Sequence, residues 1–332
     1  MGKLPAEELK KLLSCIKKDS RVIIPPMVGY DSGVHLFDGK YMVVATDPCT
    51  GVPEEWFGWL LINYAASDVA LSGAKPEFCT INLLGPKSTK PETFQKIMKQ
   101  TCTAADELGI AIVRGHTGMY TSLSDLLGVA TVYGTVQLEK LITPANAKPG
   151  DLIFCTKPLG LETITNFAIT QKALAQELFG ADQQENASKQ VYMQSCVHEA
   201  LQLARTWVVH AMHDATEGGF VSALNELAEA SKVGFNLNWE KIPISKEMLA
   251  LQSHFKLTDM QLLATSSTGT ILGAVDPQNQ EKIKDALSQS GLSSYFIGEF
   301  KENRERTLIK NGKETALPQR AKDPYDMILS GK

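Results

Sequence analysis

The sequence lacks the marks of several protein classes. Its six cysteines are scattered along the chain, without a Cys-x-x-Cys pair or a nearby group of Cys and His residues. A disulfide framework or a zinc site is therefore not expected. No apolar run is long enough to span a bilayer, and the N-terminal segment has no apolar signal core. We expect a cytoplasmic protein without membrane contact.

An excess of basic residues is also missing. The formal net charge is -4 and the pI is near 5.9, which argues against a nucleic-acid surface as the main site of action. A chain of 332 residues fits two domains. The segment 144–150 contains two prolines and a glycine, which favours a boundary there. We predict an N-terminal domain over 1–147 and a C-terminal domain over 148–332.

Helical and strand patterns alternate along the first domain, which indicates an α/β fold. The helix predicted over 55–73 places Asp68 on the same face as Phe57, Leu61 and Tyr64. Burying an unpaired charge costs several kcal/mol, so we expect Asp68 to meet a cation, a metal or a set of donors. The alternative is a structural pair with Lys75 or a cap contact.

Three further polar residues lie in a turn-rich loop or where strands are predicted to end. Asp31 lies in a turn-rich loop, and Asp47 precedes Pro48 at the end of a strand over 41–46. His116 lies in the glycine-flanked loop 114–118, which we predict between two strands. Ligands often bind at such places, although an ordinary turn, a solvated loop carboxylate and a hydrogen-bonded loop histidine are the simpler alternatives.

The segment 212–219 reads Met-His-Asp-Ala-Thr-Glu-Gly-Gly and comes just before a predicted helix. The paired glycines Gly218 and Gly219 let the backbone bend and let a ligand approach closely. Free N–H groups at the helix start favour an anion, and Asp214 offers a hard oxygen ligand for Mg²⁺. The alternative is a helix cap, with Asp214 or Thr216 closing the first turn.

This segment, together with Ala-Leu-Asn-Glu at 223–226, resembles the second-domain signature of the hydrogenase-maturation protein HypE. HypE belongs to the superfamily of aminoimidazole ribonucleotide (AIR) synthetase, selenophosphate synthetase and thiamine-monophosphate kinase. Other matches follow in order: Gly-Tyr-Asp at 29–31, Ala-Thr-Asp at 45–47 and Ser-Asp-Val-Ala-Leu-Ser-Gly-Ala-Lys-Pro at 67–76. Several ordered matches are more specific than any one of them.

The resemblance implies a two-domain α/β (α+β) AIR synthetase-like fold. Its N-terminal domain would form a homodimer through a barrel-like sheet, and the C-terminal domain would be α/β. The implied cofactors are ATP and Mg²⁺. The implied metal ligands are Asp31, Asp47, Asp68 and Asp214. The implied nucleotide-binding residues are Asp47, Gly115, Thr117, Thr216, Gly218 and Gly219. Glu226 would act as a base near the acceptor, and His116 as a phosphate contact or acid.

Three departures from the HypE pattern stand out. Ser67 replaces the family asparagine before the helix aspartate. The loop Gly-Asp-Thr-Lys is Gly-His-Thr-Gly at 115–118, where the Gly-His pair resembles selenophosphate synthetases. The sequence stops at Leu-Ser-Gly-Lys, without the tail cysteine of HypE. Whether Lys148, Lys157 or Arg114 replaces the lysine of the loop stays open.

The resemblance therefore implies an ATP-dependent enzyme that activates an acceptor by phosphoryl transfer. The acceptor would be a small molecule or a group on a carrier protein, as in the maturation of a hydrogenase or a metal cofactor, and would not be a nucleic acid. One alternative is a phosphotransferase like thiamine-monophosphate kinase or selenophosphate synthetase. Another is a non-catalytic nucleotide-binding paralogue that works through a protein partner.

Overall fold

The structure is a computed structural model that describes residue 4 and residues 6–331. The predicted domains 1–147 and 148–332 also include residues 1–3, 5 and 332, which lie outside the described residues. The structure divides into two compact units. Unit 1 contains the described residues up to Ile16, Met27–Tyr30 and the residues from Ile142 onward; unit 2 contains Lys17–Pro26 and Asp31–Leu141. The boundary between 147 and 148 stays a prediction.

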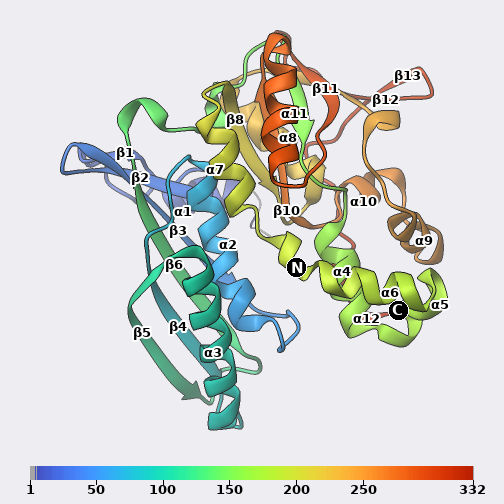
Figure 1. Cartoon of the computed structure of the whole chain (residues 1–332). Coiled ribbons are helices and arrows are strands. Elements are labelled where there is room, and N and C mark those ends of the chain that lie inside the picture. Colours follow the sequence, from blue (N-terminus) through green and yellow to red (C-terminus); the bar gives the residue numbers. More distant parts are fainter. Residues whose placement is uncertain (1–3, 5, 332) are drawn as a thin grey trace. The chain divides into compact units, whose positions relative to one another are not determined.

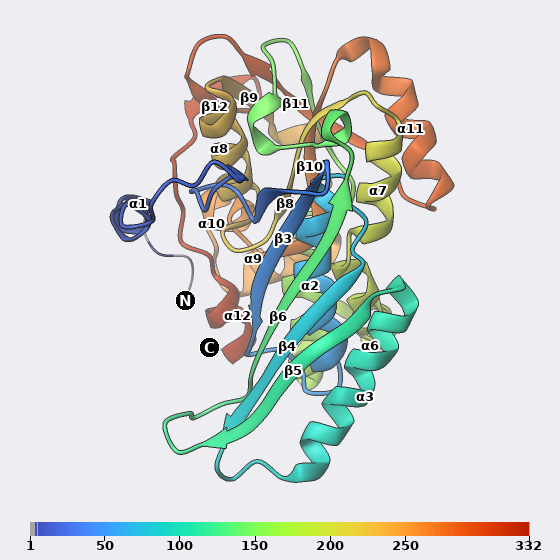
Figure 2. The ribbon, with the colours of Figure 1, turned by 90° about the vertical axis from the view of Figure 1, so that its left-hand side faces the viewer.

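Unit 2 is a six-stranded sheet with two long helices on one face (Figures 1 and 2). The strand order is β1-β2-β3-β6-β4-β5, and only β4 and β5 run parallel. The elements are β1 (Val22–Ile24), β2 (Ser32–Phe37), β3 (Lys40–Cys49), α2 (Phe57–Leu71), β4 (Phe78–Pro86), α3 (Pro91–Leu108), β5 (Ala111–Tyr120), β6 (Leu127–Val136) and the short helix η1 (Leu138–Lys140).

Helix α2 is buried along almost its whole length because its sequence is apolar on every side. It packs against β3, β6 and α3. Gly58 allows the close approach to α3, since a Cβ there would lie 2.2 Å from the carbonyl oxygen of Ile97. Asp68 is only 7% exposed, so the predicted inward orientation of this carboxylate is confirmed.

The strand that contains Asp47 does not end at this residue, which corrects the prediction. Strand β3 continues through Pro48, which pairs with Val129 of β6. Strand β2 pairs with β3 only as far as Ala45. Beyond Ala45 β3 therefore has a ladder on one side only, where a proline without an N–H group is tolerated.

The predicted loop 114–118 is also wrong. These residues, His116 included, lie inside the edge strand β5, paired with β4. The glycines suggested a loop, but Gly115 serves close packing within the sheet. A Cβ at Gly115 would lie 2.9 Å from the carbonyl oxygen of Ile81, and glycine in a strand often marks such an approach.

Unit 1 contains a seven-stranded mixed sheet in the order β13-β12-β9-β11-β7-β10-β8. Only the β12 and β9 pair is parallel. The strands are β7 (Leu152–Cys155), β8 (Val209–Ala215), β9 (Gly234–Asn238), β10 (Ser267–Val275), β11 (Tyr295–Lys301), β12 (Arg306–Lys310) and β13 (Lys313–Ala316). Every residue of β10 is buried, as expected for a strand between two neighbours and under packed helices.

The helices of unit 1 supply the rest of its core. They are α1 (Ala6–Leu13), η2 (Pro144–Asn146), α4 (Leu161–Thr170), α5 (Lys172–Phe179), α6 (Ala181–Ser188), η3 (Lys189–Gln194), α7 (Val197–Arg205), α8 (Gly219–Ser231), η4 (Trp239–Lys241), α9 (Lys246–His254), α10 (Asp259–Leu263), η5 (Pro277–Asn279), α11 (Gln280–Gln289) and α12 (Tyr325–Ser330). Helix α8 packs on β8 and β10, and Phe220 and Leu224 of its inner face are fully buried. Within the described residues, no helix combines the length and apolar character needed to cross a membrane.

Candidate functional site

Three of the predicted metal ligands lie in unit 2. Asp31 directly precedes β2, Asp47 lies in β3 and Asp68 lies in α2. The hydroxyl groups of Ser32 and Ser72 form a hydrogen bond of 2.7 Å. This bond brings the start of β2, and with it Asp31, to the C-terminal end of the helix that contains Asp68.

Asp47 points toward the same helix. Ala45 and Cys49, two residues to either side, are buried on the face that α2 covers, whereas Thr46 and Pro48 are exposed. Alternate residues of a strand share a face, so the Asp47 side chain lies on the α2 side. Strand pairing and the Ser32–Ser72 hydrogen bond therefore place the three carboxylates in the same region of unit 2, and oxygen ligands of this kind suit Mg²⁺.

His116 does not lie at the end of a strand. It is exposed in β5, and its Nε2 atom is 2.9 Å from the hydroxyl oxygen of Tyr120. Gly115 and Thr117 are exposed beside it. These three predicted residues therefore form a polar stretch on an edge strand rather than a flexible loop.

In unit 1 the turn between β8 and α8 needs both of its glycines. Gly218 has a φ of 80° and Gly219 a φ of 53°, a region that side chains disfavour. At Gly219 a Cβ would also lie 2.5 Å from the carbonyl oxygen of Thr265. The N–H of Gly219 donates to the carbonyl of Thr216 at 2.9 Å, so the predicted turn and helix start are formed as a tight loop.

Asp214 offers a buried oxygen on the strand before this turn. It is 2% exposed, and its Oδ1 atom accepts no hydrogen bond from the part of the chain that the structure describes. That atom lies 3.6 Å from Nδ1 of His213. Leaving a buried carboxylate oxygen without a donor costs free energy, and a bound Mg²⁺ would offset that cost. The residue therefore fits the predicted metal role.

His213, which the sequence interpretation did not single out, links Asp214 to Glu226. Its Nδ1 atom is 2.8 Å from the backbone carbonyl of Asp214, which can only accept, so Nδ1 carries a proton. Its Nε2 atom is 2.8 Å from Oε2 of Glu226 in α8. The predicted base thus has a histidine partner. The Met-His-Asp run was the available signal, since His213 precedes the predicted metal ligand.

The first N–H of the glycine turn already has an acceptor. The N–H of Gly218 donates to Oδ2 of Asp323 at 3.0 Å, and the hydroxyl of Ser266 donates to the same oxygen at 2.6 Å. Asp323 comes more than a hundred residues after Gly218 and belongs to no motif that we predicted. The helix start therefore binds a carboxylate of its own chain, as the electrostatics of an N-terminus favour.

Family models match both parts of the chain. Residues 29–136 match the N-terminal domain of AIR synthase related proteins, and residues 148–311 match the C-terminal domain. The chain belongs to the AIR synthase related protein family. The two-domain α/β fold that the sequence predicts is thereby confirmed, as is the resemblance to HypE and its superfamily.

Curated proteins are similar to this chain in sequence. The putative hydrogenase expression/formation protein MJ0676 of Methanocaldococcus jannaschii is 26% identical over 260 residues, which cover 76% of this chain and 72% of that protein. The selenide, water dikinase of Myxococcus xanthus is 28% identical over 337 residues, covering 91% and 92%. This AIR synthase related protein is thus similar along most of its length to one protein named for hydrogenase formation and to another named as a dikinase.

Solved structures share the fold. A HypE–HypF complex structure matches with a TM-score of 0.76 and 20% identity, covering 96% of this chain and 100% of that chain. A ThiL structure complexed with AMPPCP and TMP gives 0.72 and 17%, covering 93% of each chain. HypE in complex with ATP gives 0.68 and 19%, covering 86% of this chain and 86% of that chain. At these identities the likeness establishes the architecture alone.

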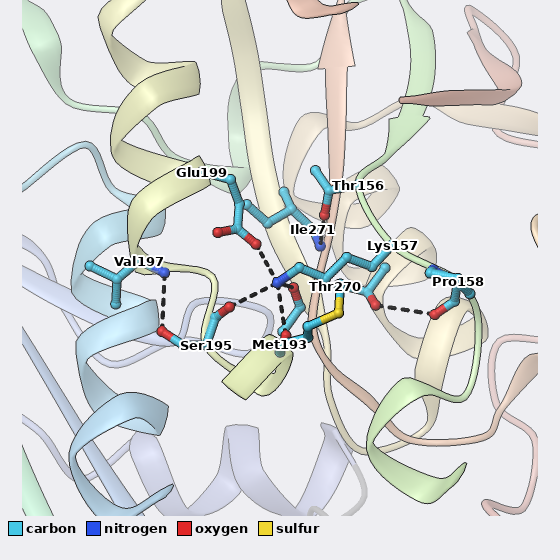
Figure 3. A network of polar contacts seen from close by, with 10 residues as sticks. Thr156, Lys157, Pro158, Met193, Ser195, Val197, Glu199, Thr270 and Ile271 are labelled. Carbon is cyan, nitrogen blue, oxygen red and sulfur yellow. Dashed lines mark hydrogen bonds and ion pairs between the residues drawn. The ribbon is translucent and has the colours of Figure 1, made fainter. Parts of the chain in front are cut away.

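The side chain of Lys157 takes part in a network of polar contacts inside unit 1 (Figure 3). The buried ammonium group donates to the carbonyl oxygens of Met193 and Ser195 at 2.8 Å and of Gly269 at 2.9 Å, and forms an ion pair with Glu199. An ammonium group has three protons to donate. The network uses them, so Lys157 does not take the place of the missing loop lysine in this family member.

Proposed function

We propose that this AIR synthase related protein is an ATP- and Mg²⁺-dependent enzyme that transfers a phosphoryl group from ATP to activate an acceptor. The observation that supports it most is the placement of Asp31, Asp47 and Asp68 in the same region of unit 2. Carboxylates that hold Mg²⁺ neutralise the phosphates and align the transfer. Two comparisons agree with this chemistry: the M. xanthus relative is named as a selenide, water dikinase, and a HypE structure was solved in complex with ATP.

Each predicted residue takes a role in this proposal. The Mg²⁺ ligands are Asp31, Asp47, Asp68 and Asp214. The nucleotide-binding residues are Asp47, Gly115, Thr117, Thr216, Gly218 and Gly219. Glu226 acts as the base that takes a proton from the acceptor, and His116 contacts a phosphate or serves as an acid. The buried Oδ1 atom of Asp214 supports the metal role most directly within unit 1.

The acceptor is either a small molecule or a group on a protein partner. The structure of a HypE–HypF complex supports the second source, and maturation of a hydrogenase or a metal cofactor is the matching process. A second candidate function is a phosphotransferase like selenophosphate synthetase. The Gly115–His116 pair and the similarity to the M. xanthus dikinase over 91% of this chain favour it. The remaining candidate is a paralogue that binds the nucleotide without turnover.

Isothermal titration with ATP, with and without Mg²⁺, tests the nucleotide site. Asp68→Asn removes a buried charge and one metal ligand with almost no change of shape, so we expect Mg²⁺-dependent affinity to fall at least about tenfold. Asp106 is an exposed residue of α3, so Asp106→Asn is the matched control and should bind ATP with the affinity of the wild type. Equal affinity in all three proteins would refute the carboxylate site.

Binding without turnover would separate the paralogue from the enzymes. Consumption of ATP is measured with selenide, thiamine monophosphate and a carbamoylated peptide as trial acceptors, and AMP, ADP, free phosphate and phosphorylated acceptor are quantified separately as products. Stimulation by one acceptor identifies the class of reaction. Tight Mg²⁺-dependent ATP binding with no stimulated or basal hydrolysis would support the non-catalytic candidate.

We also propose a homodimer through unit 2. Strand β5 is an edge strand and exposes Val113 by 57%, Met119 by 50% and Tyr120 by 42%. Exposed apolar edge strands readily pair with another strand. Light scattering should show a dimer that Val113→Lys converts to a monomer. Phe37→Lys, also 57% exposed but on β2, is the control and should leave the mass unchanged. A wild-type monomer would contradict the proposal.

A further inference from the structure

Residues Asp323–Ser330, here called the C-terminal latch, join two helix starts in unit 1. At its first residue, Oδ2 of Asp323 accepts hydrogen bonds from the N–H of Gly218 and the hydroxyl of Ser266, and Oδ1 accepts from the N–H of Tyr325 at 2.9 Å. One carboxylate therefore closes the turn before α8 and orders the first turn of α12.

The rest of the C-terminal latch packs along α4 and the residue that follows it. The side-chain amide of Asn166 donates to the hydroxyl oxygen of Tyr325 at 2.8 Å, and the amide of Gln171 donates to the carbonyl of Leu329 at 2.7 Å. Ile328 is fully buried in the unit 1 core. Asp323 is thus hydrogen-bonded to Gly218 and belongs to a segment that also contacts α4, Gln171 and the core of unit 1.

Glu162, in the first turn of α4, lies beside this arrangement. The hydroxyl of Thr268 donates to its Oε2 atom at 2.5 Å. The pKa of the Glu162 carboxyl is raised to about 7. Burial, which removes water, is the main cause, and the negative charges of Asp323 and Glu217 act in the same direction, while the hydrogen bond from Thr268 lowers the pKa. Tyr325 lies close to both carboxylates. Burial is the main cause that raises the pKa of its phenol, and the negative charges of Glu162 and Asp323 raise it as well.

We propose that the C-terminal latch covers the start of α8 and that ionisation of Glu162 opens it. The groups that interact with Glu162 are Asp323 and Tyr325 of the latch, Glu217 of the turn before α8 and the Thr268 hydroxyl of β10. None of these brings a positive charge, so a second carboxylate charge repels Asp323. Opening frees the N–H of Gly218 for a ligand.

The direction of the pH effect follows from linkage. In the closed state Glu162 keeps its proton up to about pH 7, whereas in the open state it returns to its ordinary value of 4.5. The closed state therefore binds the proton more tightly. Its stability relative to the open state is highest below pH 4.5, falls as the pH rises toward 7, and stays low above that.

Hydrogen–deuterium exchange of the full chain at pH 5 and pH 8, corrected for intrinsic rates, tests the latch. We expect protection of 216–222 and 323–330 to fall about tenfold or more at pH 8 in the wild type. In Glu162→Gln both segments should stay protected at pH 8. Glu314→Gln, an exposed position on β13, is the charge-matched control and should behave like the wild type. Equal wild-type protection at both pH values would overturn the proposal.

Two further variants keep the test decisive if Glu162→Gln does not fold. Thr268→Val removes the hydroxyl that favours the charged carboxylate, so the opening midpoint should move to higher pH. Asp323→Ala removes the closing carboxylate, so 216–222 should exchange rapidly at both pH values. An unchanged midpoint in the first variant, or full protection of 216–222 in the second, would contradict the latch.

Discussion

The two units present their polar site residues in opposite ways. In unit 2, Asp31 just before β2 and Asp47 in β3 are half-buried, and Asp68 lies in α2. In unit 1, His213 and Asp214 are each 2% exposed, and an Asp323 carboxylate already occupies the helix start. Asp31 and Asp47 of unit 2 are therefore partly accessible, whereas packing and the chain's own side chains close the groups of unit 1. We therefore expect changes in unit 1 to cost more stability.

The largest effect is expected from the chemistry proposed for each unit. Glu226→Gln should lower ATP turnover by about a hundredfold to ten-thousandfold, because general base catalysis contributes about that much. His116→Ala in unit 2 should lower it less, since His116 is exposed and hydrogen-bonded only to Tyr120 among its described contacts. Glu229→Gln, one turn further along α8 and 71% exposed, is the control. Turnover that is unchanged in Glu226→Gln would remove Glu226 from the mechanism.

A smaller effect, on stability, is expected at the buried ion pair of unit 1. Lys157→Met leaves Glu199 charged in a site where it is 6% exposed, so the free energy of unfolding should fall by about 3–5 kcal/mol. Adding Glu199→Gln should recover part of this loss. Lys96→Met breaks the exposed pair with Glu54 of unit 2 and should cost at most about 1 kcal/mol. Urea unfolding measures all three, and similar losses for Lys157→Met and Lys96→Met would contradict the comparison.

The smallest expected effect is a difference in stability loss between two glycines with positive φ, Gly39 and Gly219. At Gly39 of the β2–β3 turn, φ is 72° and nothing lies within 4 Å of an added Cβ, so Gly39→Ala should cost about 1–2 kcal/mol for the left-handed conformation alone. At Gly219 the same substitution also meets the Thr265 and Leu263 carbonyls at 2.5 and 2.7 Å. We expect Gly219→Ala to cost about 1–3 kcal/mol more. Equal losses in thermal unfolding would show that the turn before α8 relaxes freely.

The sequence was sufficient where a signal was local. The helical spacing predicted that Asp68 points inward, and the glycine pair after Asp214 predicted a turn into a helix; the structure shows both. The prediction failed at Gly115–Gly118, because glycine marks a loop in sequence but serves close packing against β4 in the sheet. It also failed at Pro48, because only strand pairing reveals that one side of β3 is open.

Contacts between segments that are distant in the chain could not be predicted from the sequence. Asp323 reaches Gly218, and Glu162 reaches Thr268, across more than a hundred residues. No spacing rule connects such pairs, since their approach depends on how β10, α4 and α12 pack together. His213 is an intermediate case: its place next to Asp214 was visible, but its partner Glu226 lies on the following helix.

The Lys157 network also bears on how the protein responds to ionic strength. Mobile ions screen charges that water can reach, and they screen buried charges much less. The exposed pairs Lys10–Glu7 and Lys284–Glu281 should therefore weaken as salt is added, whereas the ammonium of Lys157 is only 3% exposed. Its attraction to Glu199 should persist from dilute buffer to molar salt. Across that range the segment Met193–Ser195 stays tied to β10 by a cation that belongs to the protein itself.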